Sequence, residues 1–224
     1  MKKLFLNFIL LCFLFATVVV NAQSFAGEIA DFKKADSLSF PFAKQHPILF
    51  VGSSSFRKWT DIQNYFPGYP IINRGFGGSL LTDVIFYADD IIFPYYPKQI
   101  VIYCGENDLA ASDSISAKIV LQRFIKLFSI IRNKLPHTSI AFVSIKPSPA
   151  RQSIQPKVVQ ANTLIKNFLN SKKRAVFIDV YHAMLNTDGT MKKELFLEDD
   201  LHMNAKGYAI WQRIIQPSLL KFKK

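Results

Sequence analysis

The sequence predicts an α/β protein in which helices cover both faces of a parallel sheet. Five short runs rich in Ile and Val are almost continuously apolar, and Pro, Gly or polar residues bound each of them. Such runs are typical of strands buried on both faces. Longer amphipathic segments alternate with these runs, as the helices of a parallel α/β fold do. In such sheets, ligands bind beyond the carboxyl ends of the strands.

The elements can be placed along the chain with the same reasoning. The predicted strands span residues 47–51, 71–73, 99–103, 139–144 and 175–180. The predicted helices span residues 81–92, 115–135, 158–170 and 205–222. In the helix 115–135, Ile119, Phe124, Leu127 and Ile131 recur at helical spacing and form one apolar face. Pro136 is expected to end this helix.

The first 22 residues have the three parts of a secretory signal peptide. Lys2 and Lys3 give a positive start, an apolar run covers residues 4–20, and small residues precede a cleavage point after Ala22. A transmembrane anchor is the alternative, but no charged stop-transfer segment follows the run. We therefore expect a signal peptide at 1–22, a single domain at 23–224, no stable membrane span after cleavage, and a periplasmic or secreted protein.

Cysteine content and charge narrow the possibilities further. Cys12 would leave with the signal, so Cys104 would stand alone and no disulfide framework is expected. The formal charge of +12 is strongly basic, and removal of Lys2 and Lys3 would lower it by two. The positive residues are spread along the chain without a nucleic-acid-binding motif. We expect a solvated basic face and no nucleic-acid partner; the oligomeric state is not indicated.

Polar and Gly-rich clusters follow the first three predicted strands. Ser54 follows the first strand, three glycines within residues 75–78 follow the second, and Asn107 follows the third. Each cluster has a structural explanation: a serine often caps a helix, and glycines allow tight turns. The glycines do not form the G-x-G-x-x-G pattern of dinucleotide-binding proteins, which excludes that class.

A fourth cluster precedes the last predicted helix and contains Asp199 and His202. Three residues of separation place both side chains on one side of a helical turn, where the carboxylate can orient the imidazole. A metal site would need further ligands, and His182 is the one nearby candidate, so no metal is expected. A cap for the following helix is the other alternative, although Asn204 already suits that role. Together, the four clusters supply a nucleophile, a base with its orienting acid, and oxyanion donors.

These four blocks resemble, in order, those of the SGNH hydrolases, also called the GDSL-like lipase/acylhydrolase family. They are Gly52-Ser53-Ser54, Asn73 to Gly78, Gly105-Glu106-Asn107-Asp108 and Asp199-Asp200-Leu201-His202. The resemblance implies a three-layer α/β/α sandwich with a parallel, flavodoxin-like central sheet. It also implies that Ser54, Asp199 and His202 are catalytic, that Ser54, Gly78 and Asn107 form the oxyanion hole, and that no cofactor is needed.

Two positions depart from the family pattern. Ser53 replaces the Asp of the GDSL block, and Asp200 stands where Gly is common. Neither position belongs to the triad, so the departures concern substrate class and loop geometry more than reaction type.

The ester substrate is less well defined by the sequence. Arg74 and Arg151 are candidate substrate-binding residues, and Arg57 and Trp59 are further candidates for the pocket, although Trp59 is equally compatible with the core. The segment 146–153 reads as a rigid, basic loop bordering the crevice, or as a simple surface loop. We expect an exported esterase that removes short acyl groups, above all acetyl, from carbohydrate. A lysophospholipase or thioesterase of the same family is the alternative, and a non-catalytic glycan-binding protein is a further one.

Overall fold

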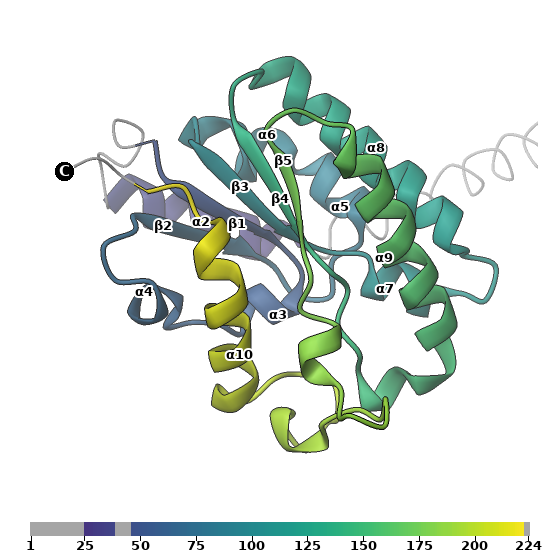
Figure 1. The fold of residues 1–224 in the computed structure, drawn as a ribbon. Coiled ribbons are helices and arrows are strands. Elements are labelled where there is room, and N and C mark those ends of the chain that lie inside the picture. The colour runs from purple at the N-terminus through teal and green to yellow at the C-terminus, as the bar shows by residue number, and fades with distance from the viewer. Residues whose placement is uncertain (1–24, 39–45, 222–224) are drawn as a thin grey trace, which may run out of the picture.

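The computed structural model describes residues 25–38 and 46–221, and within them it contains one five-stranded parallel sheet (Figure 1). The strands are β1 (Ile48–Gly52), β2 (Ile71–Gly75), β3 (Gln99–Tyr103), β4 (Ser139–Val143) and β5 (Ala175–Ile178). Their order in the sheet is β2-β1-β3-β4-β5. Helices cover both faces, so the predicted three-layer α/β/α fold is confirmed.

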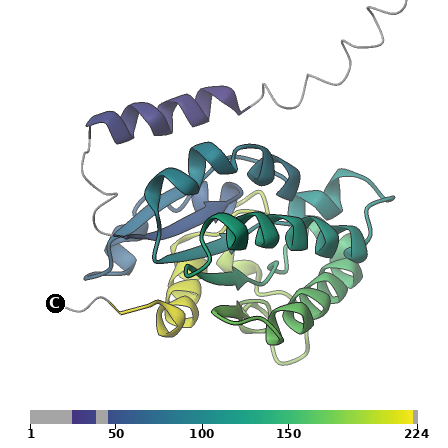
Figure 2. The same ribbon diagram turned by 90° about the horizontal axis from the view of Figure 1, so that it is seen from above.

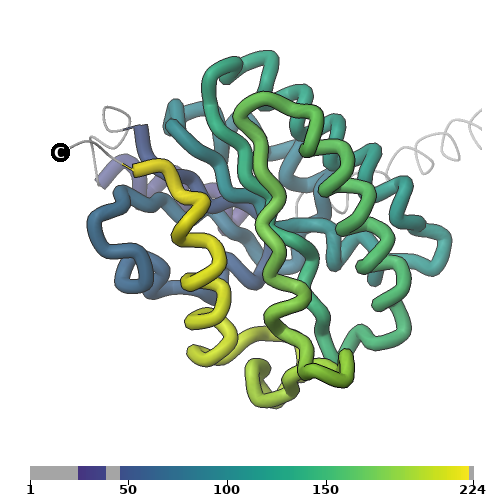
Figure 3. The backbone as a smooth tube through the Cα atoms, viewed as in Figure 1, coloured from purple at the N-terminus to yellow at the C-terminus, as the bar shows by residue number. Residues whose placement is uncertain are grey.

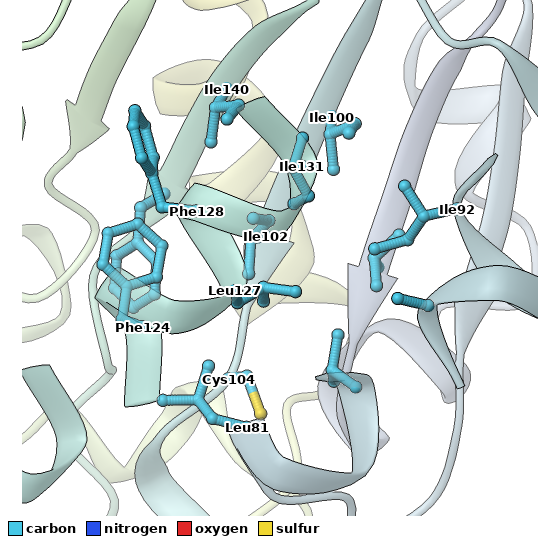
Figure 4. Close-up of a cluster of buried hydrophobic side chains, with 14 of the residues drawn as sticks. Leu81, Ile92, Ile100, Ile102, Cys104, Phe124, Leu127, Phe128, Ile131 and Ile140 are labelled. Carbon is cyan, nitrogen blue, oxygen red and sulfur yellow. The ribbon is translucent and has the colours of Figure 1, made fainter. Parts of the chain in front are cut away.

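Side chains alternate between the two faces of the sheet and build a separate apolar core on each. In β1, Leu49 and Val51 belong to one core, while Ile48 and Phe50 belong to the other. The first core is completed by α5 (Leu81–Phe86), α6 (Ala88–Ile91), α8 (Ala117–Lys134) and α9 (Gln155–Asn170), and Figure 4 shows part of it. The second is completed by α3 (Ser54–Arg57), α4 (Ile62–Tyr65) and α10 (Ala205–Ile215). Because both faces are covered, the strands read as continuous apolar runs.

Three of the four predicted helices differ from the structure by a break or by more than two residues, while the fourth, expected at 115–135, spans Ala117–Lys134. The helix expected at 81–92 breaks at Tyr87 into α5 and α6. The helix expected at 158–170 begins earlier, at Gln155, with Pro156 in its first turn, where the missing N–H is not needed. The helix expected at 205–222 ends at Ile215, and a 3₁₀ turn containing Pro217 follows it. Residue 222 lies outside the described residues.

Helix α2 (Ala26–Leu38) was not predicted. It lies along the outside of the domain (Figure 2), and Ile29 is its one fully buried residue. Polar contacts attach it: Asp36 pairs with Arg74 and accepts a hydrogen bond from the Tyr95 hydroxyl. A helix with so few apolar anchors has no clear amphipathic pattern. The signal peptide expected at 1–22 lies outside the described residues.

The segment from β5 to α10 returns the chain to the carboxyl edge of the sheet. It contains two short 3₁₀ turns, His182–Met184 and Lys193–Leu195, and its course can be followed at the bottom of Figure 3. The return places the turn at residues 198–202 next to the end of β1, as the contacts below show. In the ranges 25–38 and 46–221, no helix is both long and apolar enough to cross a bilayer.

Candidate active site

Ser54 lies at the end of β1, where the chain turns sharply into α3. Gly52 has a φ of +142°, and a Cβ atom there would lie 1.9 Å from the carbonyl oxygen of Tyr103 in β3. The next residue, Ser53, donates its N–H to that same oxygen at 3.0 Å. Glycine is therefore required at position 52, and α3 begins at once with Ser54. The strand order makes β1 a topological switch point, because the chain leaves it toward β2 and later returns to its other side in β3.

Three side chains form a hydrogen-bonded series across the sheet edge. The Ser54 Oγ lies 3.0 Å from Nε2 of His202, and Nδ1 of His202 lies 2.6 Å from Oδ2 of Asp199. The His202 side chain is 16 % exposed, so the imidazole is held but remains reachable from solvent. The structure thus brings together the three residues that the sequence singled out for nucleophile, base and orienting acid.

The Asp199–His202 segment is a turn rather than the helical turn expected from the spacing. The second oxygen of Asp199 accepts the backbone N–H groups of Leu201 and His202, at 3.0 and 2.8 Å. Asp200 adopts a φ of +52°, in the left-handed region that favours glycine, which explains why Gly is common there in the resembled pattern. Burial opposes the charge on Asp199, but the hydrogen bonds from His202 and from the two N–H groups outweigh it and hold the pKa of Asp199 well below its usual range.

The Gly-rich loop after β2 lies beside Ser54. Ser79 donates its hydroxyl to the Gly52 carbonyl at 3.2 Å, which joins this loop to the end of β1. Gly78 is exposed and has a φ of +73°, a backbone conformation that glycine adopts without strain. Within the described part of the chain, neither the Ser54 N–H nor the Gly78 N–H donates a hydrogen bond. Both remain available to an incoming anion.

Asn107 lies in the first turn of α7 (Glu106–Ala111), directly after β3. Its Nδ2 donates to the backbone carbonyl of Ser79 at 3.1 Å, so the third cluster contacts the second. Its Oδ1 accepts a hydrogen bond from Nη2 of Arg151 at 2.9 Å. The amide is therefore anchored on both sides at the same sheet edge as Ser54.

The candidate pocket residues lie in different surroundings. Arg151 lies at the site through its contact with Asn107. Arg74 instead donates to the Tyr95 hydroxyl at 2.6 Å and pairs with Asp36, which binds α2 to the sheet edge. Arg57 pairs with Glu28 of α2 at 2.8 Å. Trp59 is fully buried and stacks on Tyr208, so it is a core residue.

A buried charged cluster behind Asn107 was not anticipated. Glu106 and Lys146 are 4 % and 1 % exposed, and the Lys146 Nζ lies 2.7 Å from Glu106 Oε2. Burial lowers the pKa of Lys146, while the neighbouring Glu106 carboxylate opposes that change. Burial also works against the Glu106 carboxylate, but Lys146 and Arg151 prevail and lower its pKa. The expected basic loop at 146–153 therefore begins with a buried, paired lysine and continues as the 3₁₀ segment Pro149–Ile154. No local signal reveals this pair, because its members are 40 residues apart.

A second Asp-x-x-His pair occurs at Asp179 and His182. The His182 Nδ1 lies 2.7 Å from Asp179 Oδ2, but the imidazole side chain is 79 % exposed. Among the described residues, no group of three His, Cys, Asp or Glu side chains is arranged to hold a metal ion.

Comparisons with known proteins agree with this arrangement. The GDSL-like Lipase/Acylhydrolase family profile matches residues 43–210. The chain is 22 % identical over 190 residues to platelet-activating factor acetylhydrolase IB subunit alpha1 of Pongo abelii, covering 80 % of this chain and 77 % of that protein. Its fold is similar to that of a GDSL-like lipase from Bacteroides thetaiotaomicron, with a TM-score of 0.69, 18 % identity, and coverage of 88 % and 96 % of the two chains.

An acetylxylan esterase from Geobacillus stearothermophilus, solved as a catalytic mutant, has a similar fold as well. The TM-score is 0.64 at 13 % identity, and the match covers 79 % of this chain and 95 % of that one. The family profile spans well over half of the chain and includes all four blocks that surround Ser54. The chain therefore belongs to the GDSL-like lipase/acylhydrolase family and is a serine ester hydrolase.

Proposed function

We propose that this protein is an exported esterase that removes short acyl groups, above all acetyl, from carbohydrate through a Ser54-His202-Asp199 triad. The observation that carries the mechanism is the series of contacts from Ser54 Oγ to His202 at 3.0 Å and from His202 to Asp199 at 2.6 Å. A serine hydroxyl is a weak nucleophile by itself, and an adjacent oriented base is what activates it.

In the acylation step, Ser54 Oγ attacks the ester carbonyl while His202 Nε2 accepts the hydroxyl proton. The carbonyl oxygen becomes an oxyanion, which accepts hydrogen bonds from the Ser54 and Gly78 N–H groups and the Asn107 amide. The intermediate collapses, the imidazolium protonates the leaving alcohol, and an acyl-serine remains. Water then attacks the acyl-serine with His202 as base, and the carboxylic acid and free Ser54 are released. No electron transfer or metal is required.

Asp199 has two parts in this scheme. By accepting a hydrogen bond from the Nδ1–H group of His202, it keeps the proton on Nδ1 and leaves Nε2 unprotonated and directed to Ser54. Because its pKa lies well below the usual range, it remains a carboxylate throughout the neutral pH range and stabilises the imidazolium that forms during each step.

Two observations support acetyl as the acyl group and a sugar as the alcohol. An acetylxylan esterase shares the fold, and the curated relative is an acetylhydrolase by name. A hollow of about 380 Å³ also lies beside the segment that carries Arg151; Gln152, Asp188 and Thr190 are among the residues that line it, and the triad residues are not. The Ala150 N–H donates to the Asp200 carbonyl at 3.0 Å, which places this segment against the triad turn. Polar side chains in the hollow suit a hydroxylated alcohol group.

A phospholipid ester is the second candidate. The relative from Pongo abelii is named for platelet-activating factor, and the basic charge, formally +12 before Lys2 and Lys3 are removed with the signal, would attract an anionic surface. No observation favours a thioester. The non-catalytic glycan-binding alternative is set aside, because the chain belongs to a family of hydrolases.

Export is part of the proposal and depends on residues 1–22. Their positive start, apolar run and small residues before Gln23 support removal in a secretory pathway. Expression with a C-terminal tag, cell fractionation and N-terminal sequencing test it. A mature protein that begins at Gln23 outside the cytoplasm is expected, and an uncleaved chain in the membrane fraction would favour the anchor.

The mechanism is tested with p-nitrophenyl esters from acetyl to long acyl chains, using the chain from Gln23 and its Ser54→Ala variant. Ser171→Ala, at the exposed end of α9, is the matched control. We expect Ser54→Ala to lose hydrolysis, Ser171→Ala to retain it, and the rate to fall steeply beyond butyryl. Acetylated xylo-oligosaccharides and an acetyl ester of a lysophospholipid then separate the two alcohols. Equal activity in Ser54→Ala would refute the triad, and preference for the lipid would replace the sugar.

A further inference from the structure

The orientation of the Asn107 amide is determined by its two partners. Its Nδ2 faces a carbonyl acceptor, the Ser79 oxygen at 3.1 Å, and its Oδ1 faces a guanidinium donor, Arg151 Nη2 at 2.9 Å. A rotation of the amide by half a turn would set oxygen against oxygen and N–H against N–H. The two contacts therefore select one orientation. They leave one amide N–H that no described residue of the protein accepts.

Arg151 is in turn held by a buried carboxylate. Its Nη1 lies 3.6 Å from Glu106 Oε1, and Glu106 is the residue before Asn107 in α7. The same oxygen accepts the Ser148 hydroxyl at 2.5 Å. The other oxygen accepts Lys146 at 2.7 Å and the Tyr103 hydroxyl at 2.7 Å. Both oxygens of this carboxylate are thus bound, by Tyr103 of β3 and by residues of the segment after β4.

A buried charged cluster of this kind is costly for stability, so its position beside Asn107 suggests a role other than stability. Two ions removed from water lose several kcal/mol of hydration each, and a well-packed apolar pair often serves stability as well. Glu106, Lys146 and Ser148 are each hydrogen-bonded to the other two, and such a connected buried network favours one arrangement of its side chains. It lies directly beside the residue whose amide must be fixed for the reaction.

We propose that Arg151 is a positioning residue for the oxyanion-binding amide of Asn107, and that the buried Glu106–Lys146–Ser148 cluster holds Arg151 in place. The proposal rests on the proposed function, because it assumes that Asn107 binds the oxyanion. Arg151 acts on the transition state through Asn107 rather than by contact with the substrate. Its loss lowers kcat and leaves KM nearly unchanged, since the amide matters little until the oxyanion forms.

A double-mutant cycle on p-nitrophenyl acetate tests this. Asn107→Ala removes one oxyanion donor and is expected to lower kcat about 10²–10³-fold. Arg151→Ala is expected to lower kcat about tenfold, with KM changed less than about twofold. The Asn107→Ala/Arg151→Ala protein is expected to be no slower than Asn107→Ala alone. Effects that multiply, or a rise in KM as the main effect of Arg151→Ala, would show that Arg151 acts independently and would overturn the proposal.

Two further measurements distinguish a positioning role of Arg151 from a general disturbance of the structure by its removal. Added guanidinium at millimolar concentration is expected to raise kcat of Arg151→Ala, and to have no effect on the double variant, because the rescued contact requires Asn107. Arg213→Ala, at an exposed position on α10, is the matched control and is expected to keep the parent kcat. If Arg151→Ala does not fold, Arg151→Lys replaces it, because a compact ammonium does not reproduce the planar guanidinium fork whose two ends face Asn107 and Glu106.

The outcome is separable from that of the proposed function. Parent protein that hydrolyses the ester, with loss in Ser54→Ala, establishes the triad whatever Arg151 does. If the Asn107→Ala and Arg151→Ala effects on kcat multiply in a protein whose triad has been established in this way, only the role of Arg151 is overturned. If Glu106→Gln leaves kcat unchanged while Arg151→Ala lowers it, the part of the proposal that assigns the buried cluster is wrong.

Discussion

Two Asp-x-x-His pairs in the sequence lie in different surroundings. Asp179–His182 and Asp199–His202 share the three-residue spacing, and their carboxylate–imidazole distances are 2.7 and 2.6 Å. Only His202 reaches Ser54, and its side chain is 16 % exposed whereas that of His182 is 79 % exposed. The three-residue spacing is therefore not sufficient to place a histidine beside a nucleophile, and the two pairs differ in what the second ring nitrogen contacts.

This comparison leads to a prediction for Asp199→Asn. Oδ1 of Asp199 already accepts two backbone N–H groups, so the new amide would keep its oxygen there and turn its NH₂ toward Nδ1 of His202. Nδ1 would become an acceptor, and the proton would move to Nε2, where it blocks transfer from Ser54. We expect kcat for p-nitrophenyl acetate to fall by about 10²–10⁴-fold with little change in folding.

The second pair supplies the control. Asp179→Asn makes the same chemical change in a second carboxylate–imidazole pair, whose histidine has no contact with Ser54. Its kcat is expected to match that of the parent. Steady-state kinetics and thermal unfolding of both variants decide the matter, and an equal loss in the two would refute the assignment of Asp199 as the orienting acid.

At the scale of elements, strands and helices could be predicted where a run or a periodic pattern of apolar residues indicates burial. β1 and β3 are buried at every position, and their apolar runs predicted them. Helix α2 has one fully buried residue and is attached mainly by ion pairs such as Asp36–Arg74, which leave no periodic signal. Arg74 was a reasonable candidate for the substrate pocket, since it precedes the Gly-rich loop. The sequence does not show that the carboxylate of Asp36, 38 residues earlier, binds the Arg74 guanidinium.

The attachment of α2 predicts a loss of stability at alkaline pH. Burial, followed by the hydrogen bond to Asp36, raises the pKa of Tyr95 from 10.0 to about 12. A group whose pKa is raised in the folded state contributes stability below its unfolded pKa, and this contribution disappears as pH rises through the folded value. The window is therefore pH 10 to 12, and the contribution is about 2–3 kcal/mol.

Tyr95→Phe isolates this contribution from that of other ionising groups. Below pH 10 the parent is expected to be more stable than the variant, because the phenol donates to Asp36 and accepts from Arg74. Between pH 10 and 12 the difference in the free energy of unfolding, measured by urea denaturation, is expected to shrink. Two curves that remain parallel over this range would contradict the assignment.

For the whole molecule, topology explains which parts of the site were accessible to prediction. Parallel strands end at a common edge, so clusters that follow three successive strands must lie near one another, and Ser54, Gly78 and Asn107 could be grouped from sequence. The Glu106–Lys146 pair joins the ends of β3 and β4 instead, and its partners lack any motif. The depth at which a charged side chain lies is a property of the assembled layers, so the sequence indicated only a rigid, basic loop at the crevice, or a simple surface loop, for the segment that begins with Lys146.

The same layered packing predicts how the molecule opens. Cys104 follows β3 in the centre of the sheet and is fully buried in the core shown in Figure 4, where burial raises the pKa of its thiol well above the ordinary value. A reagent such as dithiobis(nitrobenzoate) can reach it only when helices separate from the sheet. We expect slow labelling at neutral pH that accelerates with urea in parallel with global unfolding, and no effect of reductants on the melting temperature. Labelling that is fast and independent of urea would mean that the end of β3, and with it Asn107, opens locally while the rest of the fold stays closed.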